Sequence, residues 1–178
     1  MAKKKVVKRK PARGPARKPS AKKVEAVPRA TGSLVPGLAV RGAAAAIAFY
    51  VKAFGARELS RMTGPDGKIM HAELKIGDRV LFLGDEFPEM GAPSPQTLGG
   101  SPVSLMHYVK DVDAVFARAV AAGAKPVLPV SDQFWGDRFG QVVDPFGHRW
   151  ALATHKVDMT PRQMKKAMDD WMATQGSA

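Results

Sequence analysis

The middle of the chain repeats one pattern. Residues 40–56 run from a short apolar segment through an Ala-rich stretch that ends at Gly55, and residues 109–124 follow the same plan and end at Gly123. The two copies are about 69 residues apart, and roughly three strand-like segments follow each. A repeat of this length indicates two copies of one supersecondary unit, each burying its apolar face against the other. We therefore expect a pocket where the two sheets meet.

The composition limits the classes of protein to which this chain can belong. The chain of 178 residues is long enough for one domain with a sizeable core. It has no cysteine, which excludes disulfides, thiolate metal sites and thiol nucleophiles. The apolar runs are too short to span a membrane, and the charged start lacks the apolar region of a secretory signal. We expect a cytoplasmic protein with no membrane partner.

The net charge of +12 is concentrated at the N-terminus. Residues 1–31 hold 12 Lys or Arg and one acid, whereas residues 32–178 hold 16 basic and 15 acidic residues. Repulsion between like charges and regularly spaced prolines predict a disordered basic tail over residues 1–32. Such a tail either contacts nucleic-acid phosphates without sequence readout or is simply solvated. The candidate nucleic-acid contacts are Lys3, Lys4, Lys5, Lys8, Arg9 and Lys10.

The patterns after the tail predict an α+β fold built from two βαβββ modules. The domain spans residues 33–156, with modules at 33–84 and 102–156 and a linker at 85–101. In module one we expect a helix at 43–54 and strands at 34–40, 57–62, 68–76 and 79–83. In module two we expect a helix at 112–122 and strands at 103–109, 126–130, 139–143 and 149–154.

A C-terminal helix is expected within residues 157–178. Thr160 and Pro161 are typical of an N-cap followed by the first helical position. The helix carries an apolar row, which we expect to dock on the domain or on a second subunit: Met164, Met168, Trp171 and Met172.

Several motifs resemble the vicinal oxygen chelate superfamily of glyoxalase, bleomycin-resistance and extradiol dioxygenase relatives, and its PhnB-like branch in particular. The resemblance covers about residues 33–156 and is carried by the segments at 49–56, 67–74, 94–100, 132–140 and 144–150. It implies a curved mixed sheet around a cleft and, usually, a homodimer.

Many enzymes of this superfamily hold a divalent metal with ligands from the first and last strands of each module. Carried over by spacing, the first-strand positions fall near Val35 and Ser104, and the last position of module two falls at Ala151. The matching strand of module one, residues 80–83, has no carboxylate. Apolar side chains cannot bind a divalent metal, and a lone hydroxyl is a poor ligand. We therefore expect no cofactor and no metal. If the ligand positions align differently with this sequence, a divalent metal becomes possible.

Two polar residues remain as catalytic candidates. Alternation along residues 68–76 places His71 and Glu73 on one face, with Lys75, while Met70, Ala72, Leu74 and Ile76 share the other face. A His–carboxylate pair can serve as a general base or supply two ligands to a differently built metal site. The alternative is a hydrogen-bonded pair on a half-exposed strand.

The expected ligand-binding residues are mostly apolar. In residues 103–109, Ser104, Met106 and Tyr108 share the pocket face, which leaves His107 on the helix side. Phe82 and Trp135 complete the candidate ligand-binding set, with Trp135 either part of an aromatic lid or part of a packed hairpin. Asp137 and Arg138 are expected to pair or to cap their turn, and His155 to be exposed.

Three functions follow from these features. The first is a small-molecule binding protein of the bleomycin-resistance type with a metal-poor cleft. The second is a metal-dependent lyase, isomerase or dioxygenase of the same superfamily, which rests on the fold alone. The third is an interaction protein held at nucleic acid by its tail.

Overall fold

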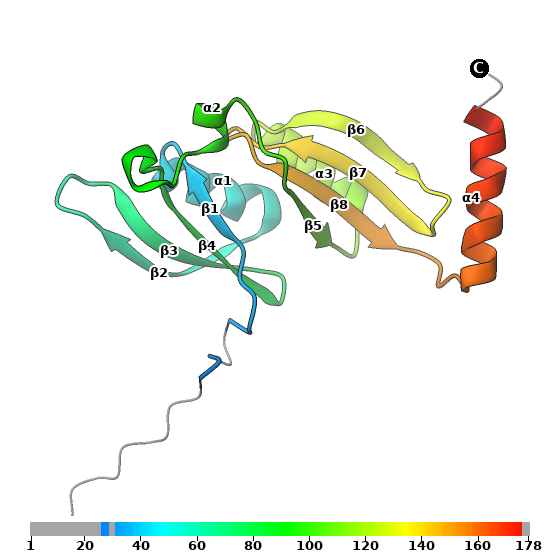
Figure 1. Ribbon diagram of the computed structural model, residues 1–178, viewed down its shortest axis with the longest axis horizontal. Helices are drawn as coiled ribbons and strands as arrows, with labels where there is room; N and C mark the ends of the chain where they lie inside the picture. The colour runs from blue at the N-terminus through cyan, green and yellow to red at the C-terminus, as the bar shows by residue number, and fades with distance from the viewer. Residues whose placement is uncertain (1–25, 29–30, 176–178) are drawn as a thin grey trace, which may run out of the picture.

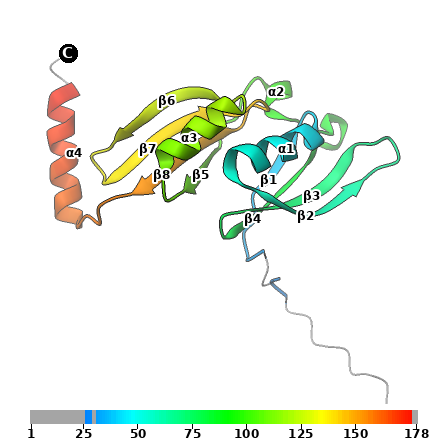
Figure 2. The same ribbon diagram turned by 180° about the vertical axis from the view of Figure 1, so that it is seen from behind.

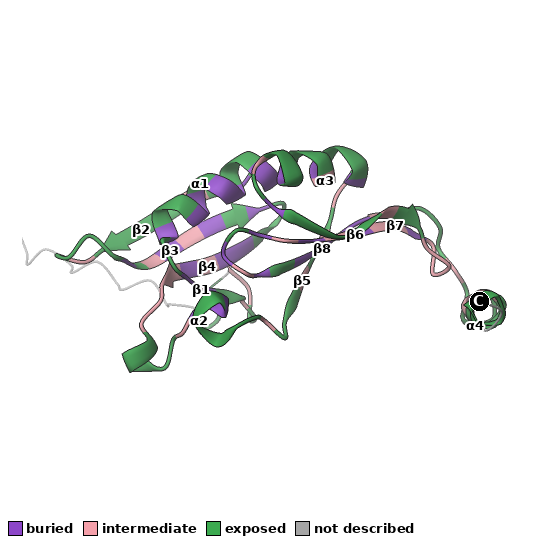
Figure 3. Cartoon of the chain, turned by 90° about the horizontal axis from the view of Figure 1, so that it is seen from above, coloured by how far each residue is buried: buried purple, intermediate pink, exposed green. Residues whose placement is uncertain are grey.

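The computed structural model describes residues 26–28 and 31–175. The basic residues proposed to contact nucleic acid, from Lys3 to Lys10, lie outside the described residues. Two four-stranded sheets lie side by side, and one long helix packs on each (Figure 1). Both helices cover the same side of the sheets, as Figure 2 shows from behind and Figure 3 from above. Neither of these two helices covers the opposite side of the sheets, where the short helix α2 (Pro95–Leu98) lies in Figure 3.

The element order matches the predicted pair of βαβββ modules. Module one comprises β1 (Gly37–Val40), α1 (Ala43–Phe54), β2 (Arg57–Thr63), β3 (Ile69–Ile76) and β4 (Arg79–Asp85), with strand order β1-β4-β3-β2. Module two comprises β5 (Ser104–Tyr108), α3 (Val112–Ala121), β6 (Lys125–Asp132), β7 (Asp137–Val143) and β8 (Arg149–His155), with order β5-β8-β7-β6. The α+β fold predicted from the sequence is confirmed.

The pairing registers reproduce the sequence repeat. In module one the parallel strands pair Gly37 with Phe82, and in module two they pair Met106 with Ala151, so both partners are displaced by the same 69 positions. The helix N-termini match in the same way. The Asp85 carboxylate accepts from the backbone N–H groups of Gly42 and Ala43, and Thr154 Oγ1 accepts from that of Val112. In each module the last strand thus caps the module's own helix.

Local signals set the helix boundaries. Helix α1 spans residues 43–54, as predicted, and ends at Gly55, whose φ of 67° is left-handed. Asp111 caps α3, since its side chain accepts from the backbone N–H of Ala114 at 3.0 Å. The predicted first strand was too long: β1 begins at Gly37, because Pro36 has no N–H to donate to the ladder.

The two modules share one core. Helix α1 packs against α3, and Phe54 lies 4.5 Å from Trp150 between ring centroids. Tyr50 is fully buried, and its hydroxyl donates to the Asp144 carboxylate of module two at 2.7 Å. Asp144 is 3% exposed and also accepts from Trp150 Nε1 at 3.0 Å and from the backbone N–H groups of Phe146 and His148 at 2.9 Å. This carboxylate fastens the β7–β8 turn and joins the modules.

The linker is more ordered than the predicted loop. It contains the short helices η1 (Pro88–Met90) and α2 (Pro95–Leu98). Glu86 accepts from the Arg41 guanidinium, the Thr97 hydroxyl and the backbone N–H of Ser94. These hydrogen bonds, with that from Thr97 first, hold the pKa of Glu86 well below its usual range. The linker is therefore tied to module one by a charged acceptor.

The C-terminal helix α4 (Pro161–Gln175) stands beyond the β6–β7 turn and the end of β8 (Figure 1). It begins at the predicted residue, and Thr160 Oγ1 accepts from the backbone N–H of Gln163. None of its residues is buried; Trp171 is 45% exposed and lies 5.3 Å from Phe134 between ring centroids. The apolar row therefore does not dock on the sheets. In the part of the chain that the structure describes, no helix is long and apolar enough to cross a membrane.

We expect Tyr50→Phe to lower the free energy of unfolding by about 1.5–3 kcal/mol, because it removes one donor from a buried carboxylate and keeps the ring contacts. Tyr108→Phe is the comparison variant: its hydroxyl also donates to a buried aspartate, but Tyr108 itself is 56% exposed, so water can replace the lost donor. Urea unfolding measures both. Equal small losses would contradict a central role for the Tyr50–Asp144 bond.

Candidate functional site

The candidate site is the side of the sheets that faces away from α1 and α3, called here the open face. In β3, Ala72, Leu74 and Ile76 are buried under the helices, while His71 and Glu73 are half-buried on the open face. The predicted alternation is confirmed for these residues. It is wrong for Met70, which is 47% exposed although it was expected on the buried face.

Strand β5 follows the same alternation. Met106 and Tyr108 are 51% and 56% exposed on the open face, and Ser104 shares that face. Leu105 and His107 are half-buried on the helix side. Burial lowers the pKa of the His107 imidazole, and its ring lies 6.0 Å from that of Phe54 between centroids. His107 is therefore a partly desolvated residue at the module boundary rather than a member of the open face.

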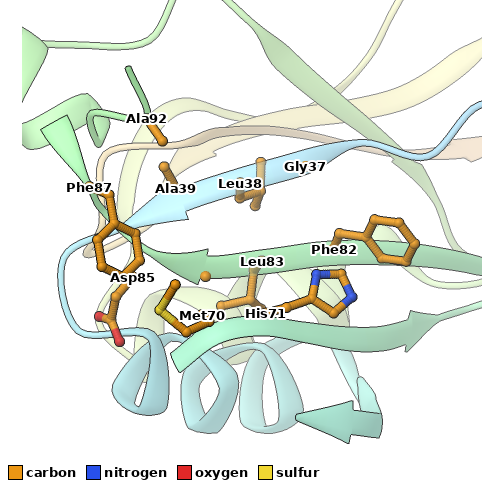
Figure 4. Close-up of a pocket in the computed structure, with 11 residues that line it drawn as sticks. Gly37, Leu38, Ala39, Met70, His71, Phe82, Leu83, Asp85, Phe87 and Ala92 are labelled. Carbon is orange, nitrogen blue, oxygen red and sulfur yellow. The ribbon is translucent and has the colours of Figure 1, made fainter. Parts of the chain in front are cut away.

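One cavity of about 420 Å³ lies on module one, along β1, β3 and β4 (Figure 4). Figure 4 shows the rings of His71 and Phe82 side by side at one end, and Met70, Asp85 and Phe87 toward the other. The two rings meet edge to face with centroids 4.8 Å apart. Phe82 thus presents an aromatic surface and His71 a polar edge to the same space.

His71 and Glu73 are brought together but do not form a hydrogen bond. His71 Nε2 lies 3.6 Å from Glu73 Oε1, beyond hydrogen-bonding distance, and both side chains are about a third exposed. The sequence therefore placed the two residues correctly on one face. The pair can bind a polar group of a ligand, whereas a strongly coupled base would need a closer contact.

A second cavity, of about 380 Å³, lies where the modules meet. It is bounded by the β3–β4 turn and the first residues of β4 on one side and by β5 and Trp150 on the other. Met106 and Tyr108 line it, together with His107. Of the five predicted ligand-binding residues, Phe82, Met106 and Tyr108 therefore line one of the two cavities, and Ser104 and Trp135 lie outside both.

Trp135 belongs instead to a polar cluster around Asp137. The Asp137 carboxylate is 4% exposed and accepts from the Tyr108 hydroxyl at 3.0 Å and from Trp135 Nε1 at 3.2 Å. Its other oxygen lies 2.7 Å from His155 Nδ1, and His155 Nε2 lies 2.9 Å from Asp158. The cluster fixes the Tyr108 hydroxyl at the edge of the open face.

The cluster corrects one expectation and confirms another. Asp137 does not pair with Arg138, whose guanidinium lies 2.7 Å from Asp113 and 3.2 Å from Asp132 instead. His155 is about half exposed, as expected, but Asp137 and, to a smaller extent, Asp158 raise its pKa by hydrogen bonding. The hydrogen bond to Asp137 likewise raises the pKa of the Tyr108 phenol. The separation of Tyr108 and Asp137 by 29 residues gives no local sequence signal.

The family's metal positions do not fit a divalent ion in this chain. The register places Phe82 and Ala151 at equivalent positions of the two last strands, and neither side chain has a donor atom. Ser104 offers one hydroxyl and Val35 none. Residues 26–28 and 31–175 contain no group of three or more His, Cys, Asp or Glu that could hold a metal ion.

Comparison with known proteins agrees with this fold. The family described as Glyoxalase/Bleomycin resistance protein/Dioxygenase superfamily matches residues 32–152. The chain belongs to this superfamily. The resemblance seen in the sequence motifs is thereby confirmed.

The similar proteins come from bacteria and a plant. An uncharacterized protein of Mycobacterium tuberculosis is 49% identical over 139 residues, which are 76% of this chain and 82% of that protein. The crystal structure of TioX from Micromonospora sp. ML1 is 32% identical, has a TM-score of 0.54, and is covered completely by 72% of this chain. A gene product of Arabidopsis thaliana is 30% identical, with a TM-score of 0.57 over 68% of this chain and 97% of that chain.

Solved structures of lower identity share the fold. The PhnB protein from Bacillus cereus is 19% identical, with a TM-score of 0.53 over 68% of this chain and 98% of that one. The fosfomycin resistance protein FosX from Listeria monocytogenes, solved with Mn(II) and sulfate, is 16% identical, with a TM-score of 0.55. The comparisons thus identify the superfamily. They do not identify a ligand, whose chemical class has to be inferred from the residues of the site.

The raised pKa of His155 has a direct test. A pKa above the unfolded value means that this residue's contribution to stability is complete below the unfolded pKa and is lost as the pH rises through the folded pKa. We expect Asp137→Asn to move the His155 pKa toward its ordinary value more than Asp158→Asn does, because Asp137 is the larger cause. NMR titration of the imidazole measures both shifts. An unchanged titration in Asp137→Asn would refute this assignment.

Proposed function

We propose that the domain binds a small, largely apolar molecule on its open face and needs no divalent metal to do so. The observation that carries the proposal is the position of Phe82. This residue lines the module-one cavity and also stands where the superfamily's chelating position would fall. An aromatic ring at that position supplies contact area in place of a ligand atom.

The remaining groups of the open face fit such a ligand. Met106 supplies a flexible apolar surface, which adapts to irregular shapes. Tyr108 adds a ring whose hydroxyl is held by Asp137. His71 and Glu73 supply polar contacts that orient the bound molecule. A mostly apolar cavity with a few fixed polar groups is typical of small-molecule sites.

A metal-dependent lyase, isomerase or dioxygenase is the alternative within the superfamily. It would need His71 and Glu73 as ligands, because they are the paired imidazole and carboxylate on the open face. Two protein ligands are fewer than the three that catalytic zinc sites use, so the site would require further donors from a ligand or a second chain.

We expect the neutral dye Nile red to bind the full-length protein on the open face. Phe82→Ala should weaken binding by about tenfold and Met106→Ala by less, since both remove apolar contact area. Met90→Ala is the matched control, because Met90 is 72% exposed on η1 and lines neither cavity. A fluorescence titration measures the affinities.

Equal affinities for the three variants and the parent would refute binding at the open face. Metal analysis of the purified protein separates the alternative: a stoichiometric divalent ion that is lost in His71→Ala would replace the proposal with the metal-dependent function. Mass spectrometry of small molecules that co-purify would then identify the natural ligand.

We also propose a homodimer. The open face exposes Met106 and Tyr108, and α4 exposes Met168, Trp171 and Met172, so apolar surface is available at two places for a second copy. Dimerisation would cover part of the open face and enclose the ligand more fully. The homodimer stays a prediction.

The basic tail supports nucleic acid as a second class of partner. Residues 1–31 carry a net charge of +11, whereas the rest of the chain carries +1. We expect the full chain to bind duplex DNA without sequence preference and to lose affinity steeply as salt rises. Deleting residues 1–31 should abolish that salt-dependent binding in a filter or anisotropy assay. Equal binding by the deleted chain would exclude the tail as the contact.

A further inference from the structure

A separate groove lies on the boundary between the modules. Its volume is about 610 Å³, and the lining residues come from the end of α1, the start of β2, the end of β3, the end of β5 and one side of α3. Its charged members are Arg57, Lys75, Lys110 and Arg118. These residues are far apart in the sequence, so the fold itself brings four cations together.

The charge of this groove is uncompensated. No aspartate or glutamate is among its lining residues. Within the described part of the chain, none of the four cations has an ion pair, whereas Arg41, Arg61 and Arg138 each pair with a carboxylate. The chain from residue 32 onward is almost neutral, so a basic average does not explain the cluster. Cations gathered in a concave, partly apolar site attract a negatively charged occupant.

The groove also offers a neutral hydrogen-bonding group. His107 lines it, and among the described residues its imidazole has no hydrogen-bond partner, whereas its backbone belongs to the β5–β8 ladder. Burial lowers the pKa of the imidazole and so favours its neutral form, which can donate one N–H without adding charge. Its ring is positioned by the edge-to-face contact with Phe54.

The apolar lining sets a second requirement. Phe54 and Val115, each 7% exposed, also line the groove, as does Val109. An inorganic anion alone would leave these apolar side chains in contact with water. An anion with an aromatic or aliphatic part would cover them and gain from their burial.

We propose that this groove binds a small organic phosphate. Two guanidinium groups can form paired hydrogen bonds with phosphate oxygens, and two ammonium groups add point charges. The phosphate lies among Arg57, Lys75, Lys110 and Arg118, and the organic part covers Phe54 and Val115. The groove shares His107 and Tyr108 with the inter-module cavity, but its four cations line neither cavity of the open face, and the proposal does not depend on the function proposed there.

Phenyl phosphate is the test ligand, added to the full-length protein and followed by ¹H–¹⁵N NMR. We expect the largest amide shifts at Val109 and Lys110. Lys75→Gln and Arg118→Gln should each weaken binding by roughly tenfold, because each removes a charge-assisted hydrogen bond. Benzyl alcohol, which keeps the ring and lacks the phosphate, should not produce these shifts.

Arg162→Gln is the matched control. It removes one positive charge from α4, outside the groove, and leaves any contribution of the basic tail the same in all variants. Circular dichroism checks that each exposed substitution leaves the fold intact. Weaker binding in both groove variants but not in the control supports the proposal. Equal affinities in all variants, no binding by the parent protein, or shifts confined to residues outside the groove would overturn it.

Discussion

The arrangement of the two modules depends on the buried Asp144 carboxylate. A desolvated charge is costly unless all its acceptor capacity is used, and here two side chains and two backbone N–H groups satisfy it. Only Tyr50 among these donors belongs to module one. The requirement to satisfy one anion therefore also fixes where α1 lies against module two. Burial, with the nearby carboxylate as the second cause, raises the Tyr50 pKa well above its ordinary value, so the phenol stays a donor.

With the helices fixed on one side, the chemistry falls on the sheets and at their boundary. The open face combines the Phe82 and His71 rings on one module with Met106 and Tyr108 on the other. The boundary groove combines cations from several elements around Phe54 and Val115. These surfaces differ in character, since the first is mainly apolar and the second is cationic. A single duplicated scaffold thus carries two surfaces of unlike chemistry.

The features that the sequence predicted correctly are those determined by residues close together in the chain. Helix 43–54, the Asp111 cap and the alternation of His71 and Glu73 with buried residues all follow from local periodicity. The sequence did not predict the Tyr50–Asp144 bond, whose partners are 94 residues apart, or the Asp137 cluster. It also missed the cationic groove. Such sites are assembled by tertiary packing, so their side chains carry no shared spacing that a linear pattern could display.

Strand β5 has one further consequence. Its residues His107 and Tyr108 line both the inter-module cavity and the cationic groove, so the two hollows adjoin each other. Any rotation of that imidazole changes the shape of both spaces at once. Occupants on either side would then influence each other's affinity by the same factor, as thermodynamic reciprocity demands. In this way, two different ligands bound at adjoining sites of one duplicated fold can bind cooperatively without a second subunit.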